Sequence, residues 1–305
     1  MVTRNSHIVQ PKNLRSKSFL RGEAWTGFLF TVPAILGFLL FNLIPIISSA
    51  YFSLTSYNIV TPPQFVGLDN YVTMFSGSDP FFYKSLGLTT YYTLLSVPLS
   101  IVFSFLVALL MNQKLIGLPL FRTIFYLPSI VPVVATSMVW LWLLDPSMGL
   151  LNVSLRSLGL PTSKWIFGEQ TVIPSLAVMS LWSRGNVMIL FLAALKDVPT
   201  TYYEAAEIDG AGAFKRVWYI TIPLLSPIIF LNLVTGLINA FQTFAQAFIM
   251  TQGGPNNRSL FYVYYLFREG FQYSKMGFAC AIAMVLFVII TILTAILFKT
   301  SNNWV

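Results

Sequence analysis

The residue types that could do chemistry gather in one short polar segment, Tyr202–Pro223, which lies between two long apolar stretches. This segment holds three carboxylates and two basic side chains, whereas the stretches on either side are almost free of charge. Its charged residues are Glu204, Glu207, Asp209, Lys215 and Arg216. Carboxylates make stronger hydrogen bonds to cationic groups than neutral acceptors do. The segment is therefore the first candidate for a contact surface.

Local sequence signals in the polar segment predict a helix, a turn and a second helix. Pro199 ends the preceding helix, and Thr201 followed three residues later by Glu204 matches a capping box, in which each side chain bonds an unpaired amide at a helix start. Gly210 tolerates a positive φ and therefore predicts the turn. The second helix is expected to end before Pro223, which lacks a backbone donor.

The spacing within the polar segment resembles the EAA loop, a motif of the permease subunits of binding-protein-dependent ABC importers. The pattern is E-A-A-x3-G-x9-I-x-L-P, and this chain departs from it at Ile222, where leucine is usual. The residues assigned to the loop are Glu204, Ala205, Ala206, Asp209, Gly210, Ile220 and Pro223. In the family this loop contacts the ATPase subunits, so the resemblance implies the same coupling role here.

Three further stretches are similar to the sugar-uptake branch of this family, in particular to the larger permease of the maltose type. They are Trp140 with Gly149–Asn152, the run Thr251–Pro255, and Tyr265–Gly270. The similarity extends from Trp25 to Lys299. It implies the type I importer fold, with six transmembrane helices and both termini in the cytoplasm.

Composition independently predicts a membrane protein. Hydrophobic residues make up 56% of the chain and charged residues 9%, with a mean hydropathy of +0.74, and a soluble domain does not cover that much apolar surface. Within a bilayer the backbone groups must be paired internally, and the sequence lacks the alternating pattern of a β-barrel. The fold class expected from the residues is therefore an all-α membrane protein.

Six apolar segments reach the roughly 20 residues that cross the hydrocarbon core of a bilayer. They are 28–52, 89–111, 121–144, 172–195, 224–250 and 278–298. The first is longer than the roughly 7 to 15 apolar residues of a cleaved signal, so we expect it to be a retained helix. Prolines within several segments, Pro128 and Pro132 among them, predict kinks or early helix ends.

The basic residues predict the orientation of the chain and its division into parts. With the N-terminus inside, eleven of the eighteen Lys and Arg residues lie in cytoplasmic parts and six in the outer loops, which matches the excess of positive charge usual in inner loops. We expect a cytoplasmic basic tail at 1–24, a transmembrane domain at 25–300 with the coupling loop at 199–223, and a tail at 301–305. Both termini and the polar segment would face the cytoplasm of a prokaryotic cell.

Several kinds of chemistry are missing from the sequence. It contains no G-x-x-x-x-G-K-[ST] phosphate loop, so ATP hydrolysis would have to come from a partner chain. His7 and Cys280 are the only histidine and the only cysteine, which excludes a zinc set, a thiol–histidine pair and an internal disulfide. The six segments carry no Asp or Glu, the groups that couple ions in secondary transporters. We expect no cofactor, no metal and no catalytic site.

Arg184 is a charged residue deep within the fourth apolar segment. It lies about eleven residues, or roughly 16 Å, from the cytoplasmic end of that segment, close to the middle of the membrane. An arginine there costs at least about 2.5 kcal/mol unless water or a partner meets it. Two interpretations are open: Arg184 lines a polar cavity, or it forms a structural ion pair or carbonyl contact.

Two polar faces accompany Arg184. In the fourth segment, a spacing of i, i+3, i+4, i+7 places four residues on one side of a helix. They are Met179, Trp182, Ser183 and Asn186. In the fifth segment a similar stripe consists of Asn232, Thr235, Asn239, Gln242 and Gln246. Such stripes either hold helices together through hydrogen bonds or line a path for a hydroxyl-rich solute.

The resemblance favours the second interpretation of these stripes. The positions that contact sugar in the maltose-type permease fall here on Met179, Trp182, Ser183, Asn186, Gly236, Ala240 and Thr243. Gly236 and Ala240 lack the polar groups found there in that relative. Together with Arg184 and Asn239, these positions form the candidate substrate path. A tryptophan face surrounded by a few amides suits a sugar ring.

The resemblance implies a permease subunit that translocates a sugar or oligosaccharide delivered by an extracellular solute-binding protein, and that is not itself an enzyme. It would work in the cell membrane with a second homologous permease and two ATPase subunits, and no nucleic-acid partner is expected. Import of glycerol 3-phosphate or another polyol derivative by the same machinery is the alternative, because Arg184 could pair a phosphate. A secondary transporter is the remote alternative.

Overall fold

The computed structural model describes residues 17–113 and 116–301. The described residues therefore leave out most of the expected basic tail with His7, part of the loop with Lys114, and the end of the C-terminal tail. The ranges outside the description are 1–16, 114–115 and 302–305.

The described residues are mostly helical, which confirms the expected helical fold. Their only strands are β1 (Thr55–Ser56) and β2 (Gln64–Phe65), an antiparallel pair in which Thr55 lies opposite Phe65. The chain divides into two compact units, one up to Tyr51 and one from Phe52 onward.

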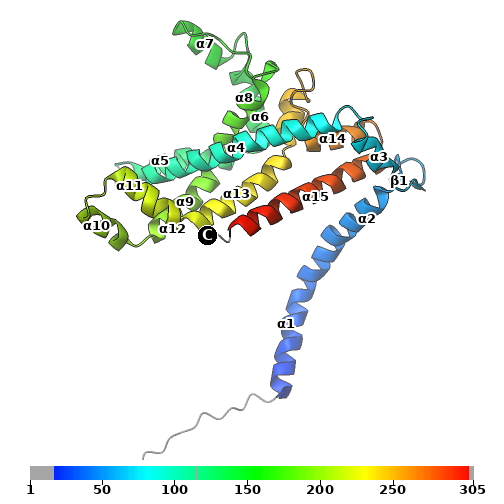
Figure 1. Cartoon of the computed structure of the whole chain (residues 1–305), viewed down its shortest axis with the longest axis horizontal. Coiled ribbons are helices and arrows are strands. Elements are labelled where there is room, and N and C mark those ends of the chain that lie inside the picture. Colours follow the sequence, from blue (N-terminus) through cyan, green and yellow to red (C-terminus); the bar gives the residue numbers. More distant parts are fainter. Residues whose placement is uncertain (1–16, 114–115, 302–305) are drawn as a thin grey trace, which may run out of the picture. The chain divides into compact units, whose positions relative to one another are not determined.

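The described part of the first unit, from Lys17 to Tyr51, lies in one long apolar helix (blue in Figure 1) that ends at Phe52. It is apolar enough to cross a membrane over the 28 residues Trp25–Phe52. A π-helical turn lies just before Pro45, where the Ile44 N–H bonds to the Leu39 carbonyl five residues back. The proline explains the turn, because it lacks a backbone donor and its ring displaces the carbonyl four residues before it. The parts of this helix are α1 (Lys17–Phe38), η1 (Leu39–Leu43) and α2 (Ile44–Phe52).

The second unit is built from helices of very different lengths. In chain order they are α3 (Asp69–Phe75), α4 (Phe82–Met111), α5 (Leu118–Tyr126), η2 (Leu127–Ser129), α6 (Val133–Leu143), α7 (Leu150–Ser157), η3 (Trp165–Phe167), α8 (Val172–Leu181), α9 (Gly185–Asp197), α10 (Thr200–Ile208), α11 (Ala213–Arg216), η4 (Val217–Thr221), α12 (Ile222–Leu224), α13 (Ser226–Phe241), η5 (Ala247–Thr251), α14 (Tyr262–Phe267), η6 (Arg268–Gln272) and α15 (Met276–Ser301).

Two helices of this unit, α4 and α15, are each long and apolar enough to cross a membrane. Three further pairs meet that description only when taken together, because each is bent at a short break. The bend is 98° between the α5–η2 helix and α6, 49° between α8 and α9, and 68° between the α11–α12 helix and α13. Two of the six predicted segments, 121–144 and 172–195, are therefore broken helices, and the third bent pair joins the polar segment to the fifth predicted segment. The first break falls at Pro132 as predicted.

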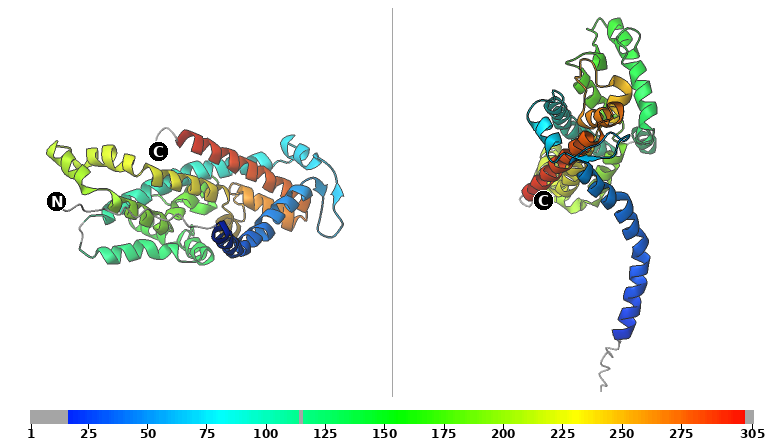
Figure 2. Two further views of the ribbon diagram at one scale, coloured as in Figure 1. Left: turned by 90° about the horizontal axis from the view of Figure 1, so that it is seen from below. Right: turned by 90° about the vertical axis from the view of Figure 1, so that its right-hand side faces the viewer.

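Helix α4 is the centre of the second unit, with α8, α9 and α13 packed along it (Figures 1 and 2). Its buried face carries small hydroxyl side chains spaced by three or four positions, which is the helical repeat. They are Ser85, Thr89, Thr93, Ser96, Ser100 and Ser104. Small side chains let helices approach closely inside a membrane, where packing and not the hydrophobic effect holds helices together. Pro98 lies in the same helix without interrupting it.

Two clusters of buried side chains hold this unit together. The larger contains Tyr262 and Tyr265 of α14, and the Tyr262 N–H bonds to the Thr89 hydroxyl of α4 at 2.9 Å. The smaller joins α4, α9 and the start of α13 through residues such as Phe191 and Leu225. Figures 1 and 2 show α10 and α11 at one end of the unit and α3, β1 and α14 at the other. The polar segment therefore lies at the end of the unit opposite the β1–β2 strand pair.

Gly185, the first residue of α9, accounts for the break between α8 and α9. A Cβ atom there would lie 2.7 Å from the Phe125 carbonyl oxygen and 2.8 Å from the Tyr126 Cα, so glycine lets the end of α5 come this close. The predicted continuous helix over 172–195 is therefore wrong, and so is the single face assigned to four of its residues. Met179 lies in α8, Trp182 and Ser183 lie in the break, and Asn186 lies in α9.

Gly185→Ala should destabilise the packing of α5 on α9. The added Cβ meets backbone atoms that cannot rotate away, and overpacking of this kind costs about 1–3 kcal/mol. Gly87→Ala is the control, because a Cβ at this exposed position of α4 meets nothing within 4 Å. Thermal unfolding of the purified chain in detergent should show a lower midpoint for Gly185→Ala and an unchanged or higher midpoint for Gly87→Ala. Equal midpoints would contradict the close contact.

Candidate functional site

The polar segment folds as two helices, as predicted, but the first begins differently. Helix α10 starts at Thr200 with Pro199 in the N-cap position (φ −59°, ψ 131°), and no side chain caps it. Thr201 is therefore inside the first turn, and the predicted capping box with Glu204 is wrong. The proline ring fixes φ for the helix start one residue early. Glu204 is exposed, and no hydrogen bond or ion pair joins its carboxylate to another described residue.

Gly210 ends α10 in the way that its position predicts. Its φ is +73°, its N–H bonds to the Glu207 carbonyl at 3.1 Å, and the Ala211 N–H bonds to the Ala206 carbonyl at 2.8 Å. These two bonds form a Schellman motif, which satisfies carbonyls at a helix end and uses a residue in the left-handed conformation. A Cβ at Gly210 would meet no atom within 4 Å. The constraint at this position is therefore the backbone angle and not space.

The second helix of the polar segment is longer than predicted. It consists of α11, η4 and α12 and runs through Pro223 to Leu224. Its middle part, η4, is a π turn in which the Ile222 N–H reaches the Val217 carbonyl. As before Pro45, the π turn directly precedes the proline and adjusts the hydrogen-bond pattern for the missing donor.

Two contacts fix α10 against this second helix. The Tyr203 hydroxyl lies 3.0 Å from Oγ1 of Thr221, which is buried, and Nη1 of Arg216 lies 3.4 Å from Oε2 of Glu207. We call the resulting structure, α10 to α12, the two-helix projection. Its surface combines Glu204 with large exposed apolar side chains, namely Tyr202, Ile208, Phe214, Trp218 and Tyr219. Exposed apolar patches of this kind mark contacts with proteins or membranes.

Arg184 lies in the break between α8 and α9, where it borders a cavity of about 50 Å³. Besides Arg184, the cavity is lined by Ser100 of α4 and by Asn232, Thr235, Gly236 and Asn239 of α13, with Val97, Ile101 and Val187. Asn232 and Thr235 each bond a carbonyl of α13 itself at 2.8 Å, so these bonds do not tie α13 to another helix. Much of the predicted polar stripe therefore faces the arginine.

The guanidinium of Arg184 keeps unused hydrogen-bonding capacity. Its Nε is buried and has no hydrogen-bond partner among the described residues. Tyr92 of α4 lies within electrostatic range, with Ser180 and Thr243 beside its hydroxyl. On the other side Arg184 borders a second cavity of about 130 Å³, whose walls include Trp182. The arginine therefore stands between two cavities with a donor still free.

The structure keeps only part of the predicted fifth-segment stripe on one helix. Gly236 and Asn239 reach the 50 Å³ cavity, whereas Ala240 is buried in the larger core cluster. Helix α13 ends at Phe241, so the predicted continuation of the stripe through Gln242 and Gln246 is wrong. The predicted stripe assumed a repeat of about 3.6 residues per turn, and that repeat ends with the helix at Phe241.

The predicted path residues of the fourth segment lie in three different surroundings. Met179 borders a separate, largely apolar cavity of about 370 Å³ together with Trp140. The Trp182 ring meets Trp140 edge-on with centroids 6.0 Å apart. Asn186 lies toward the end of α5, where its Oδ1 is 3.4 Å from the Ser129 hydroxyl. These residues therefore surround the break and do not line a single wall.

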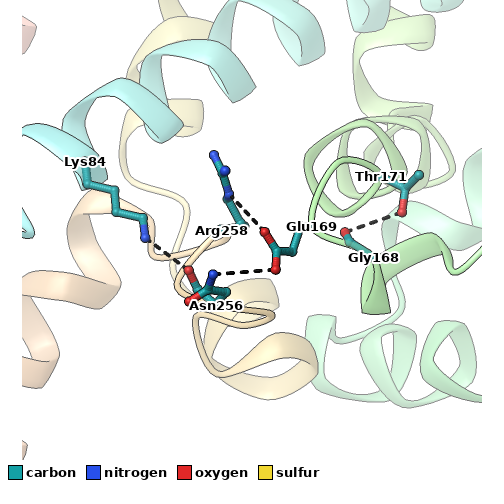
Figure 3. Close-up of polar contacts among 6 residues, drawn as sticks. All are labelled: Lys84, Gly168, Glu169, Thr171, Asn256 and Arg258. Atoms are coloured by element: carbon teal, nitrogen blue, oxygen red, sulfur yellow. Dashed lines mark hydrogen bonds and ion pairs between the residues drawn. The ribbon is translucent and has the colours of Figure 1, made fainter.

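A polar cluster that sequence reasoning missed joins three segments near the start of α4 (Figure 3). Glu169, just before α8, lies 3.6 Å from Nε of Arg258 and 3.5 Å from Nδ2 of Asn256. Lys84 of α4 donates to the Asn256 carbonyl at 3.0 Å. The partners are 87 and 172 residues apart in the chain, so no local pattern reveals them. Beside this cluster lies an open cavity of about 680 Å³.

Comparison with known proteins agrees with the spacing of the polar segment. Residues 100–304 match the family described as "Binding-protein-dependent transport system inner membrane component". The chain is 40% identical to the probable ABC transporter permease protein YesP of Bacillus subtilis, over 96% of this chain and 95% of the relative. It is 32% identical to the arabinooligosaccharides transport system permease protein AraP of the same organism, over 91% and 88%. It is 30% identical to the trehalose/maltose transport system permease protein MalF of Thermococcus litoralis, over 95% and 98%.

The fold also matches a solved structure, that of a bacterial alginate ABC transporter in complex with an alginate pentasaccharide-bound periplasmic protein. The TM-score is 0.82 at 23% identity, over 92% of this chain and 96% of that chain. At this identity the likeness shows the fold alone. The family match and the relatives named as permeases confirm the expectation of a transport component and not an enzyme. The chain belongs to the family of binding-protein-dependent transport system inner membrane components.

Proposed function

We propose that this chain is one permease subunit of an ATP-driven importer that carries a sugar or oligosaccharide across the cell membrane. An extracellular solute-binding protein delivers the solute, a second homologous permease completes the path, and two ATPase subunits supply the energy. The observation that carries this proposal is the two-helix projection with Glu204 unpaired on its surface, in a chain of this transport family. Relatives named as permeases for arabinooligosaccharides and for trehalose or maltose support a sugar as the solute.

The proposed subunit has six membrane spans with both termini and the two-helix projection in the cytoplasm. The spans are the three long helices, the two bent pairs before the projection (α5–η2 with α6, and α8 with α9), and α13 after it. The excess of Lys and Arg in the parts assigned to the inside supports this orientation. Broken helices are compatible with a membrane where neighbouring helices cover the irregular backbone.

The position of the two-helix projection in the chain suggests how force reaches the solute path. The projection directly follows α9 and directly precedes α13. The same two helices carry lining residues of the cavity beside Arg184, Val187 from α9 and Asn239 from α13 among them. An ATPase movement that displaces the projection therefore displaces two walls of that cavity. Glu204 supplies the charged contact through which the ATPase holds the projection.

The cavity beside Arg184 is too small to hold a sugar in the described conformation. Its volume of about 50 Å³ compares with roughly 300–1,000 Å³ for pockets that hold small molecules. Passage of a sugar therefore requires α9 and α13 to separate, or the second permease to supply one wall of a wider path. The free guanidinium donor and the amides of Asn232 and Asn239 would then meet the hydroxyl groups of the solute.

Cysteine labelling tests the proposed orientation. In a Cys280→Ala background, Thr162→Cys should react with a membrane-impermeant maleimide in intact cells, and Gly212→Cys should react only in inside-out vesicles. Both positions are exposed, and a Cβ at Gly212 meets nothing within 4 Å, so the two changes leave the fold intact. The reverse labelling pattern would overturn the orientation.

Glu204→Gln should uncouple ATP hydrolysis from uptake. Glutamine keeps the size of the side chain and removes its charge, and Glu204 has no cap or ion pair within the described residues whose loss could unfold α10. We expect ATPase association to weaken by about 1.5–3 kcal/mol, the contribution of one charged hydrogen bond, and uptake in vesicles to be lost. Solute-binding protein should still dock.

Glu207→Gln is the matched control for this experiment. It also removes one carboxylate from α10, but that carboxylate forms an exposed ion pair with Arg216. Such a pair contributes about 0–1 kcal/mol to the stability of the fold. ATPase copurification and uptake should therefore stay near normal. If the two variants behave alike, Glu204 has no special contact and the projection is only a connector.

Arg184→Met should leave the transporter assembled and change its uptake, because the substitution removes the charge beside the cavity and keeps an unbranched side chain. Thr291→Val is the control, since it also removes a polar group from a long apolar helix but at an exposed position of α15. Uptake of labelled arabinotriose, maltotriose and glycerol 3-phosphate into proteoliposomes gives the readout. If the variant fails to assemble and any surviving complex transports normally, the role of Arg184 is structural. If the wild-type transporter prefers glycerol 3-phosphate, the proposed sugar substrate is wrong.

A further inference from the structure

A larger polar cavity lies at the end of the second unit opposite the two-helix projection. Its volume is about 530 Å³, within the roughly 300–1,000 Å³ of pockets that bind small molecules. Its walls come from the stretch between β1 and the start of α4 and from the stretch between η6 and α15. They include Asn58, Asn70, Asp79, Glu269, Tyr273 and Lys275.

The charged groups of this cavity are held in place by the protein. The Glu269 side chain is only 4% exposed, and its Oε2 lies 3.3 Å from Nζ of Lys275, whose side chain is 62% exposed. Asp79 Oδ1 accepts the N–H groups of Phe81 and Phe82 at 2.7 and 2.8 Å. Each carboxylate has more acceptor positions than these contacts use. Two carboxylates and one ammonium line the cavity, and the Arg268 guanidinium over the Phe81 ring balances the second carboxylate.

Two amides of the lining are oriented by neighbouring groups. Asn70 Nδ2 donates to the carbonyls of Ser53 and Thr55 at 2.8 and 3.0 Å, which leaves its side-chain oxygen as an acceptor. Asn58 Oδ1 accepts from both the N–H and the hydroxyl of Thr61 at 2.9 and 2.7 Å, which leaves its amide hydrogens as donors. One amide therefore offers an acceptor and the other offers donors, the combination that hydroxyl groups of a ligand need.

Aromatic rings supply the apolar part of the walls. They belong to Tyr57, Phe81, Tyr273 and Phe278. The Arg268 guanidinium lies 4.4 Å from the centroid of the Phe81 ring and so covers one of its faces. Tyr273 is 54% exposed and forms an accessible wall. A ring face beside fixed amides and carboxylates matches both parts of a sugar, its apolar C–H face and its hydroxyl edge.

We infer that this cavity is a second binding site, for a neutral sugar ring, separate from the cavity beside Arg184. The one ammonium of the lining already pairs with Glu269, so the lining offers no unpaired cation to an acidic sugar or a phosphate ester. No group of three or more potential metal ligands occurs among the described residues, and the carboxylates here are two. The inference concerns direct binding to this chain and does not depend on the proposed transport path.

Saturation-transfer difference NMR on the full chain in lipid nanodiscs tests this site. Arabinotriose and maltotriose serve as neutral probes, and trigalacturonate serves as the acidic probe. The neutral probes should give the stronger signals. Tyr273→Leu removes the accessible ring and Glu269→Gln removes the buried charge, and each should weaken binding about tenfold, equivalent to about 1.4 kcal/mol. If Glu269→Gln fails to fold, Tyr273→Leu at the exposed rim carries the test.

Two controls distinguish binding in this cavity from binding elsewhere on the chain. Phe271→Leu changes an exposed ring of η6 two residues before Tyr273 that does not line the cavity, and it should leave binding unchanged. Arg184→Met reports on sugar bound in the other cavity, and its signal is compared with that of Tyr273→Leu. Binding lost in Arg184→Met but kept in Tyr273→Leu would place the sugar in the other cavity and overturn the inference.

Two further results would also overturn it. One is a trigalacturonate signal as strong as that of the neutral probes. The other is the absence of any neutral-sugar signal from the wild-type chain. If, in that second case, Tyr273→Leu and Glu269→Gln weakened association with the solute-binding protein, the cavity would be a docking pocket for a protein side chain instead.

Discussion

The second unit depends on the close approach of α8, α9 and α13 to one unbroken helix, α4. The buried face of α4 carries a row of serines and threonines among its apolar side chains, and side chains of this size bring helix backbones near enough to pack. In lipid that packing has to hold the helices, because apolar side chains gain little by leaving lipid for protein. Helices α8, α9 and α13, each of which belongs to a broken pair, are assembled against this unbroken helix, and Leu225 at the break before α13 is buried against its end.

Much of the fold could be predicted from the sequence because the governing signals are local. Hydropathy marked the long helices, and the glycine at 210 marked the turn that the Schellman motif now explains. What failed was helical periodicity carried across a tertiary contact. No residue pattern within 172–195 indicates that Gly185 contacts the end of α5. The predicted helical face from Met179 to Asn186 therefore crossed a position at which the helix is broken. The capping box failed for a related reason, since Pro199 takes the cap position before Thr201 can.

In the candidate site, too, the features set by local sequence could be predicted and those set by tertiary contacts could not. The depth of Arg184 in an apolar segment is a property of the sequence, and it predicted a polar neighbourhood of some kind. Its neighbours are tertiary: Ser100 comes from α4 and Asn239 from α13, and no spacing rule links them to an arginine between α8 and α9. The cluster around Glu169 and the cavity around Glu269 lay outside sequence reasoning for that reason too, because each is built from segments that meet only after folding.

The π turns have a consequence for the direction in which surfaces point. Among the described residues they are η1, η4, η5 and η6, and each spans one more residue per hydrogen-bonded loop than an α-helix does. One extra residue rotates everything on one side of the turn by roughly 100° relative to an uninterrupted helix. Because η4 lies between α11 and α13, the direction in which Phe214 and its neighbours point around the helix axis depends on one extra residue in the π turn. Deletion of one residue from η4 would turn the exposed surface around Phe214 to another direction without altering any side chain on that surface.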